Sequence, residues 1–193
     1  MIRRLLWGLS ILVLGASLGL GSAWALINAP GFGKSAQVGA WRIDLFTGST
    51  TADMYTRARI AVILFLALNR EETIYYVAST DDRGWPLRPS CVYKVEGRVQ
   101  AARWWSITAY GPDYFLIDNP IRRFSFNMRS VRPDAAGRFA FVTAPTEQSG
   151  NWLPTPTRDQ FYLTYRLYNP APEIGAHPER LDPPKITREG ACE

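Results

Sequence analysis

The chain begins with one long apolar segment, from Leu5 to Ile27, that contains no charged residue. At a rise of ~1.5 Å per residue, a helix of about 23 residues spans about 34 Å, enough to cross a ~30 Å hydrocarbon layer. Arg3 and Arg4 precede the segment, and basic residues favour the cytoplasmic side of a membrane. The pattern therefore predicts a cytoplasmic stub over residues 1–4, a transmembrane helix over residues 5–27 and an extracytoplasmic remainder.

A cleaved signal peptide is the alternative interpretation of the same segment. Arg3 and Arg4 would then form its basic region, and Ala23-Trp24-Ala25 a small-x-small cleavage site. We favour an uncleaved signal anchor, because the apolar run continues past Ala25 and Trp7 and Trp24 resemble interfacial anchors. Both interpretations export the remainder. We therefore expect a single-pass protein of a bacterial inner membrane whose C-terminal domain lies in the periplasm, if the host has two membranes.

Small residues recur within the apolar segment. Gly15 and Gly19 form a G-x-x-x-G pair, and small residues four apart let two membrane helices approach closely. Glycine is also common in membrane helices that do not associate. Pairing of two such helices through Gly15 and Gly19 is therefore a hypothesis and not a requirement of the sequence.

Beyond a glycine-containing linker over residues 28–37, the apolar pattern predicts strands and one helix. Apolar residues recur at helical spacing over residues 53–70, after Asp53 or Thr51 as an N-cap. Elsewhere apolar and polar residues alternate with a period of two, and Gly, Pro, Asn and Asp separate the runs. Strands are expected over residues 38–46, 73–79, 91–96, 103–110, 114–117, 124–128, 138–143 and 161–168.

Short alternating strands joined by regular turns are typical of an all-β domain. We expect residues 38–169 to form a mainly β domain, an antiparallel jelly-roll-like β-sandwich with one amphipathic helix. Aromatic residues make up 13% of the chain, which suits a sheet-rich core. The proline-rich tail over residues 170–193 is expected to run extended, packed on the surface of the domain.

Charge and cysteine content narrow the classes of function. The net charge is +5, but the basic residues are scattered, so no nucleic-acid partner is expected. Cys91 and Cys192 are the only cysteines, and outside the cytosol such a pair predicts a disulfide. That bond would close a loop of about 100 residues, worth roughly 4.7 kcal/mol in the chain-entropy model as an upper value. Two cysteines and one histidine do not make a zinc site without carboxylates, so neither a metal nor a cofactor is predicted.

The sequence also lacks the residue combinations of common hydrolases. His177 is the only histidine and lies in the proline-rich tail, away from any candidate triad. The aspartates fall largely in turns, where their side chains bond to the local backbone. No glycine-rich phosphate loop joins a strand to a helix. We therefore predict no catalytic residue and lean against an enzyme.

Polar and aromatic residues at strand ends and in the loop over residues 147–160 make up the candidate binding site. Aromatic faces beside arginine and asparagine suit sugars, acidic groups or a protein hot spot. The alternative is that the tryptophans fill the core and the polar side chains bond to backbone groups, which we favour for Trp105. The candidate residues are Trp104, Tyr110, Asn119, Arg123, Asn151, Trp152, Arg166 and Tyr168.

Several short phrases across the exported part carry a family resemblance. They include Trp41-Arg42, Tyr55-Thr56-Arg57-Ala58, the run from Arg103 to Thr108, the run from Phe115 to Pro120, and the run from Leu163 to Pro170. The most specific is Asn151-Trp152-Leu153-Pro154 followed by the strand Arg166-Leu167-Tyr168. Together they resemble the bacterial domain of unknown function 1214 over about residues 41–192. The resemblance implies a jelly-roll-like β-sandwich, but it brings no settled activity.

In that family the domain often forms the C-terminal half of a longer protein, behind a second uncharacterised domain, number 1254. The resemblance therefore implies a protein partner, a separate chain that carries this companion domain. Two hypotheses follow. The leading one is a membrane-anchored binding or assembly domain. The alternative is a cell-envelope carbohydrate-binding or carbohydrate-active protein with a glycan ligand, in which Trp104, Tyr110, Asn151, Trp152 and Arg166 line one concave site.

Overall fold

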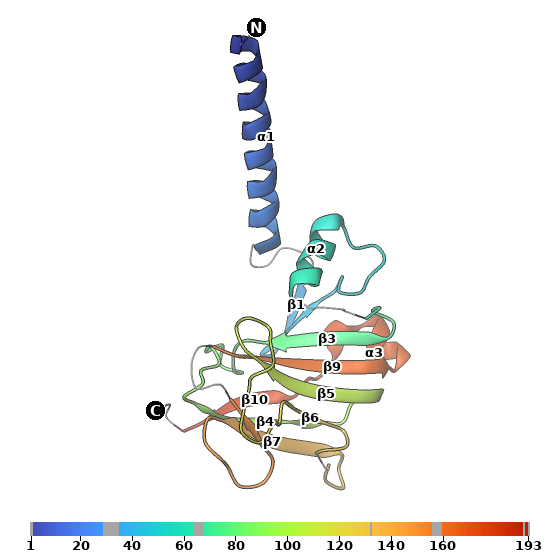
Figure 1. Cartoon of the computed structure of the whole chain (residues 1–193). Coiled ribbons are helices and arrows are strands. Elements are labelled where there is room, and N and C mark those ends of the chain that lie inside the picture. Colours follow the sequence, from blue (N-terminus) through green and yellow to red (C-terminus); the bar gives the residue numbers. More distant parts are fainter. Residues whose placement is uncertain are drawn as a thin grey trace.

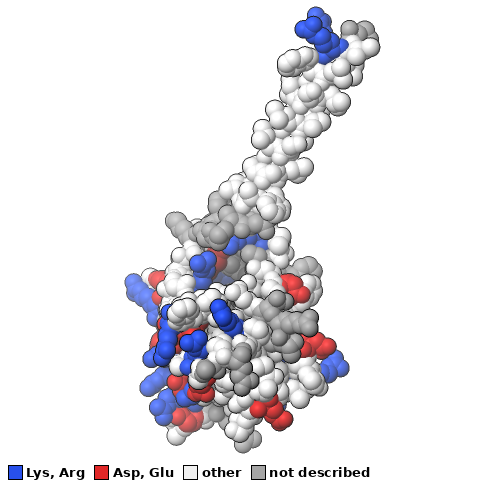
Figure 2. Space-filling model, turned by 90° about the vertical axis from the view of Figure 1, so that its left-hand side faces the viewer, with Lys and Arg blue, Asp and Glu red and all other residues white. Residues whose placement is uncertain are grey.

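The computed structural model of the chain describes residues 2–28, 35–63, 68–131, 133–155, 160–190 and 192. Helix α1 (Ile2–Asn28) is the predicted apolar helix, and its segment Ile2–Ile27 is long and apolar enough to cross a membrane. Figure 1 shows α1 extending away from the β domain, and its large apolar side chains are exposed. In Figure 2 this helix is uncharged along its length, with basic side chains only at its tip. Most of the predicted linker, residues 29–34, lies outside the described residues.

Two β-sheets make up the domain (Figure 1). The first has six strands, each antiparallel to its neighbours, and the second has four, of which only the β7–β8 pair is parallel. The six-stranded sheet has the order β1 (Ser35–Val38), β2 (Trp41–Asp44), β3 (Thr73–Ala78), β9 (Tyr162–Pro170), β5 (Ala102–Tyr110), β6 (Ser125–Asn127). The four-stranded sheet has the order β10 (Lys185–Glu189), β4 (Val92–Arg98), β7 (Arg138–Ala144), β8 (Trp152–Pro154).

The core lies between these sheets and follows the predicted alternation. Along β9, Leu163, Tyr165 and Leu167 are fully buried, and Trp105 and Ile107 are equally buried on the neighbouring β5. The opposite sheet contributes aromatic and aliphatic side chains, and rings from the two sheets contact one another, as in the Phe126–Phe141 pair. The predicted β-sandwich is therefore confirmed, as is the core position of Trp105. The remaining large core residues are Trp41, Ile43, Tyr76, Tyr93, Val95, Phe139, Phe141, Leu153, Phe161 and Ile186.

Three strand predictions need correction. The single strand expected over residues 38–46 is a hairpin of β1 and β2 that turns at Gly39, whose φ of 60° suits glycine. The strand expected over residues 114–117 is a loop that makes one isolated bridge, from Leu116 to Tyr110. Strand β8 lies inside the predicted loop over residues 147–160. Its three residues were too short a run to predict a strand.

Helix α2 (Met54–Ile63) forms where one was predicted, and Asp53 is its N-cap. The Asp53 carboxylate accepts hydrogen bonds from the backbone N–H groups of Tyr55 (2.9 Å) and Thr56 (3.1 Å). The helix is shorter than expected, because Leu68 to Arg70 are not helical; residues 64–67 lie outside the described part. Thr56 is the only one of its described residues that is buried.

The C-terminal tail is more regular than its proline content predicted. It forms helix α3 (Pro172–Ala176), the short helix η1 (Pro178–Arg180) and the edge strand β10. Proline at the first helical position needs no N–H partner, so Pro172 and Pro178 are compatible with these turns. The Tyr76 hydroxyl donates a 2.7 Å hydrogen bond to the Pro178 carbonyl. The predicted disulfide between Cys91 and Cys192 is present and ties the end of the tail to the start of β4.

Candidate functional site

Side chains on the outer face of the six-stranded sheet point away from the core and form a polar-aromatic surface. The alternation that buries Tyr76 and Tyr165 leaves Tyr75 and Arg166 on the other face, and these two residues are paired across β3 and β9. On β5, Trp104 and Tyr110 belong to this same face. The outer face is therefore built by residues whose neighbours in sequence anchor the core.

Arg166 is the centre of this surface. Its guanidinium donates hydrogen bonds to the Tyr110 hydroxyl (2.8 Å) and the Thr108 hydroxyl (3.3 Å). The same group lies 5.2 Å from the centroid of the Tyr110 ring and 5.8 Å from that of Tyr75. Burial raises the pKa of nearby Tyr168, and the positive charge of Arg166 opposes that rise. Among the described residues, no carboxylate lies within ion-pair distance of Arg166.

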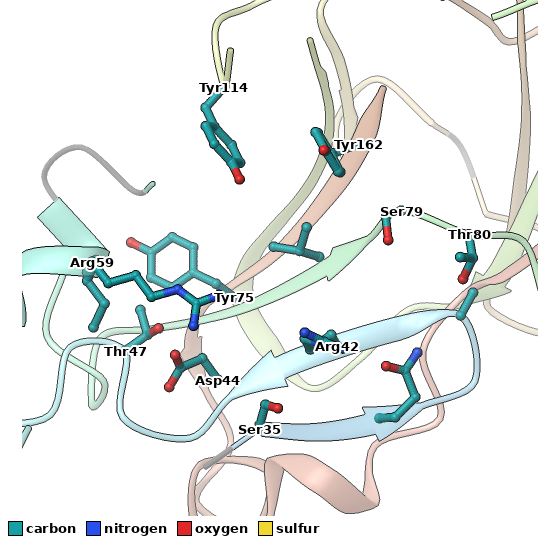
Figure 3. A pocket seen from close by; sticks show the side chains of 14 residues that line it. Ser35, Arg42, Asp44, Thr47, Arg59, Tyr75, Ser79, Thr80, Tyr114 and Tyr162 are labelled. Atoms are coloured by element: carbon teal, nitrogen blue, oxygen red, sulfur yellow. The ribbon is translucent and has the colours of Figure 1, made fainter. Parts of the chain in front are cut away.

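A pocket of about 470 Å³ adjoins this surface, between the sheet, helix α2 and the loop that contains Tyr114 (Figure 3). Its volume lies in the range of small-molecule sites. Strands β2 and β3 form its floor, with Ala40 and Val77 as apolar parts. Hydroxyl groups surround the floor, from Ser35, Thr47, Ser79 and Thr80. The charged and aromatic lining residues are Arg42, Asp44, Arg59, Tyr75, Tyr114 and Tyr162.

The pocket walls come from segments far apart in sequence and are held together by ring contacts. The Tyr114 and Tyr162 rings stack with their centroids 5.7 Å apart and an interplanar angle of 14°. Burial and the neighbouring Tyr162 raise the pKa of Tyr114, while the positive charge of Arg59 opposes the rise. The Tyr75 hydroxyl accepts a 3.0 Å hydrogen bond from the Leu68 backbone N–H, just after α2.

Charged groups converge inside the pocket. Figure 3 shows Arg59 reaching from α2 into the part of the pocket where Asp44 of β2 also points, with Arg42 on the neighbouring floor. The Asp44 carboxylate also accepts a 2.8 Å hydrogen bond from the Phe46 backbone N–H, which fixes its position. With two arginines against one aspartate, the lining carries an excess of one positive charge. Such a site can hold an anionic group against an apolar, aromatic wall.

Four of the eight predicted site residues lie together on the outer face: Trp104, Tyr110, Arg166 and Tyr168. Trp104 and Tyr168 are paired neighbours on β5 and β9, and the Arg129 guanidinium lies 5.4 Å from the Trp104 ring centroid. None of these four lines the pocket itself, although Tyr75, paired with Arg166, and Tyr162, paired with Tyr110, do. The prediction therefore identified the neighbouring surface and not the cavity.

The other four predicted residues have structural contacts elsewhere. Leu153 of β8 is fully buried, so its neighbour Trp152 points away from the core, on the side of the four-stranded sheet. The Trp152 indole donates to the Ala144 carbonyl (2.9 Å), and the Asn151 amide donates to the Ala140 carbonyl (3.2 Å). Arg123 donates to the Trp152 carbonyl at 3.0 Å.

Asn119 closes a loop. Its amide donates to the carbonyls of Ile117 (3.0 Å) and Arg123 (3.1 Å), and its side-chain oxygen accepts from the Arg123 N–H (2.9 Å). The positions of Asn151 and Trp152 on the four-stranded sheet correct the expectation of one concave site lined by Trp104, Tyr110, Asn151, Trp152 and Arg166. The two groups belong to opposite outer faces of the sandwich. This geometry removes the basis for the carbohydrate hypothesis.

Sequence reasoning missed the pocket residues Arg42, Arg59, Tyr75, Tyr114 and Tyr162. Arg42 and Tyr75 did carry a signal, because each alternates with core residues on a strand and must therefore face outward. No such signal exists for Arg59 and Tyr114. Their place over the sheet depends on how α2 and the loop fold back, which periodicity does not determine.

Two solved structures align with this chain. The VPA0106 protein from Vibrio parahaemolyticus matches with a TM-score of 0.64 and 21% identity, over 94% of this chain and 45% of that protein. An uncharacterised protein from Burkholderia cenocepacia matches with a TM-score of 0.46 and 19% identity, over 61% of this chain and 29% of that protein. The first likeness shows the shared fold, and this chain spans less than half the length of that protein. No curated protein matches the chain.

Sequence comparison identifies the family directly. The profile described as "Protein of unknown function (DUF1214)" matches residues 72–172, from the start of β3 to the start of α3. The matched segment is more than half of the 193-residue chain and contains most of the central strands. This protein belongs to the DUF1214 family.

Proposed function

We propose that this protein is a membrane-anchored, extracytoplasmic binding domain whose ligand site is the pocket on the outer face of the six-stranded sheet. The observation that carries the proposal is the convergence of Arg42, Asp44 and Arg59 with three tyrosine rings around about 470 Å³ of space. Titratable groups gathered in a preformed apolar pocket are the usual mark of a ligand site. The ligand is a small molecule with an anionic group and an apolar part.

Binding is tested with the full chain in nanodiscs and a panel of aliphatic and aromatic carboxylates and phosphates, followed by native mass spectrometry. Arg42→Gln removes a charge from the pocket floor, and Val77→Trp fills the space above it. We expect both variants to lose the ligand that the wild-type chain retains. Arg138→Gln, which removes an exposed charge from the other sheet, is the matched control and retains it. Equal retention of the ligand by the wild type and the three variants would show that the pocket is not the ligand site.

The compartment is part of this proposal. An apolar helix at the start of the chain and a disulfide that closes most of the domain both favour an oxidising compartment beyond the cytoplasmic membrane. In a host with two membranes, we place α1 in the inner membrane and the domain in the periplasm. A C-terminal alkaline phosphatase fusion is then active, and a C-terminal GFP fusion exported by the same route is dark. The reverse pattern would contradict this topology.

A second function, assembly with a separate chain, is favoured by one specific observation. Almost all of this chain, 94%, corresponds to only 45% of the Vibrio parahaemolyticus protein, so in that protein the shared fold is joined to a further part. We propose that a partner carrying the companion domain supplies it. Gentle purification from the native membrane, followed by mass-spectrometric identification, should recover such a chain in stoichiometric amount. Recovery of the protein alone would rule out a stable complex.

A further inference from the structure

The two walls of the pocket that lie above the sheet also carry exposed apolar side chains. On α2, Met54 is 82% exposed and Val62 is 65% exposed, and in the loop after Tyr114, Phe115 is 73% exposed. Both segments also contribute pocket residues, Ile60 in α2 and Tyr114 in the loop. Met54 and Val62 lie about 240° and 200° around the helix from Ile60, so they face away from the cavity. Exposed apolar side chains on two segments that wall one cavity mark an interaction surface beside it.

The length of the linker places this surface close to the membrane. Seven residue steps separate Asn28, the last residue of α1, from Ser35, the first residue of β1. At ~3.3–3.6 Å per residue, such a segment spans at most about 25 Å. Ser35 itself lines the pocket, so the pocket stays within that distance of the end of α1 whatever path the linker takes. Figure 1 shows α2 at the end of the domain from which α1 extends.

The charges of α2 suit the surface of a bilayer that contains anionic lipids. Helix α2 carries Arg57 and Arg59 and no acidic residue after its N-cap Asp53. Arg59 points into the pocket, so Arg57, with the exposed Met54 and Val62, is the part of α2 that faces a bilayer surface. Figure 2 shows basic side chains on the part of the domain nearest α1. Cationic groups beside exposed apolar side chains favour contact with a surface that contains anionic lipids.

We propose, building on the proposed function, that the ligand of this pocket is an amphiphile with an anionic head group that is presented by the membrane. The head group lies between Arg42 and Arg59. The start of its apolar chain lies along Ile60, Val77 and the tyrosine rings, and the remainder passes between α2 and the loop at Phe115 toward the lipid.

This assignment accounts for the exposed apolar rim, which a ligand arriving from water does not require. A small hydrophilic anion needs only the arginines, and an exposed Phe115, next in sequence to the pocket residue Tyr114, costs solubility without aiding recognition. For an amphiphile, the apolar rim continues the apolar pocket wall outward. The arginines then bind the head group of the amphiphile, and the exposed apolar side chains contact the part of its chain that extends to the lipid surface.

A photoactivatable fatty acid, with a diazirine on its chain, tests the proposal with the full chain in phosphatidylcholine nanodiscs. After irradiation, mass spectrometry locates the cross-linked residues. We expect cross-links in the peptides that contain Ile60, Val77 and Phe115. We expect Arg42→Gln to lower their yield about tenfold, the effect of losing one charge-assisted hydrogen bond. Arg138→Gln, the matched loss of charge on the other sheet, should leave the yield unchanged.

Competition experiments distinguish an amphiphile presented by the membrane from the more general proposal of a small anionic ligand. Unlabelled long-chain fatty acid should suppress the cross-links, whereas butyrate, which has the same head group, should not at equal concentration. If butyrate competes as well as the long-chain acid, the pocket is an anion site and the membrane source is wrong. Cross-links spread evenly over the domain, or equal yields from Arg42→Gln and Arg138→Gln, would overturn the assignment of the amphiphile to this pocket. A melting curve for each variant confirms that the compared proteins are folded.

Discussion

The indole of Trp105 stacks on the phenyl ring of Phe139, with ring centroids 4.5 Å apart and an interplanar angle of 24°. Trp105 belongs to β5 of the six-stranded sheet and Phe139 to β7 of the four-stranded sheet, so this contact joins the two layers. Trp105 is fully buried and Phe139 is 3% exposed. The Trp105 indole N–H finds no hydrogen-bond partner among the described residues, so the side chain contributes through packing.

Truncation of this contact should strongly destabilise the domain. We expect Trp105→Ala to lower the free energy of unfolding by about 3–5 kcal/mol, because it leaves a large cavity between the sheets. Trp105→Phe should cost much less, since it keeps a ring against Phe139 and removes the unpartnered N–H. The control is Trp85→Ala, at a position that is 59% exposed, where a change of about 0.5 kcal/mol or less is expected. Denaturant titration of the purified chain measures all three; equal losses at positions 105 and 85 would contradict this account of the core.

Reduction of the Cys91–Cys192 disulfide should destabilise the domain without unfolding its core. The bond spans 101 positions in the sequence, so the chain-entropy model gives roughly 4.7 kcal/mol as an upper value. Cys192→Ser is the cleaner variant, because Cys91 is 1% exposed and its replacement would also open a cavity. The reduced wild type and Cys192→Ser should melt at the same temperature, below that of the oxidised protein. A reductant should not change the melting temperature of Cys192→Ser; a further decrease would mean that another effect of the reductant is being measured.

The sequence predicted those features that depend on local periodicity or on residue counts. The apolar length of α1, the alternation that buries Leu163, Tyr165 and Leu167, and the pairing of two cysteines each follow from a short pattern or from composition. The pocket does not follow from such a pattern. Arg59 and Tyr114 line it together only because α2 and a distant loop fold over the same sheet. The strand β10 was missed for a similar reason. Its backbone pairs with β4 about 90 residues earlier, and proline content alone suggested an extended tail without strand pairing.

Gly48 should be essential for the position of α2. Its φ of 72° favours glycine, and a Cβ at this position would lie only 2.6 Å from the Arg70 backbone nitrogen. The same segments are joined by a 3.2 Å hydrogen bond from the Arg70 N–H to the Gly48 carbonyl. Gly48→Ala should therefore push apart the segments on either side of α2 and lower the melting temperature. Gly150→Ala is the matched control, because Gly150 has a φ of 83° but open space around its Cβ, so only the backbone cost of about 1–2 kcal/mol applies. Equal effects of the two variants would show that the close approach to Arg70 does not matter.

Arg166 should stabilise the outer face through its geometry as well as its charge. Arg166→Ala removes two hydrogen bonds and two cation–π contacts, and we expect a loss of about 2 kcal/mol. Arg166→Lys keeps the charge but lacks the planar set of donors, so it should recover less than half of that loss. A double-mutant cycle with Tyr110→Phe should give a coupling free energy of about 1 kcal/mol. Zero coupling, or full recovery by lysine, would mean that the hydrogen bond to Tyr110 contributes nothing.

Association of α1 through Gly15 and Gly19 is a separate prediction about the apolar N-terminal helix. Nothing in the described chain comes within 4 Å of a Cβ built at either glycine, so this stripe of the helix is open to a second copy. If two helices pair here, Gly15→Ile and Gly19→Ile should each lower the dimer fraction in a bilayer, because the added side chain separates the backbones. Gly21→Ile adds the same volume on a different face of α1 and serves as the control. Energy transfer between labelled chains in vesicles, measured over a range of protein-to-lipid ratios, gives the dimer fraction. A fraction that falls equally in all three variants would indicate a general effect of volume, and one that does not change would show that α1 does not pair through Gly15 and Gly19.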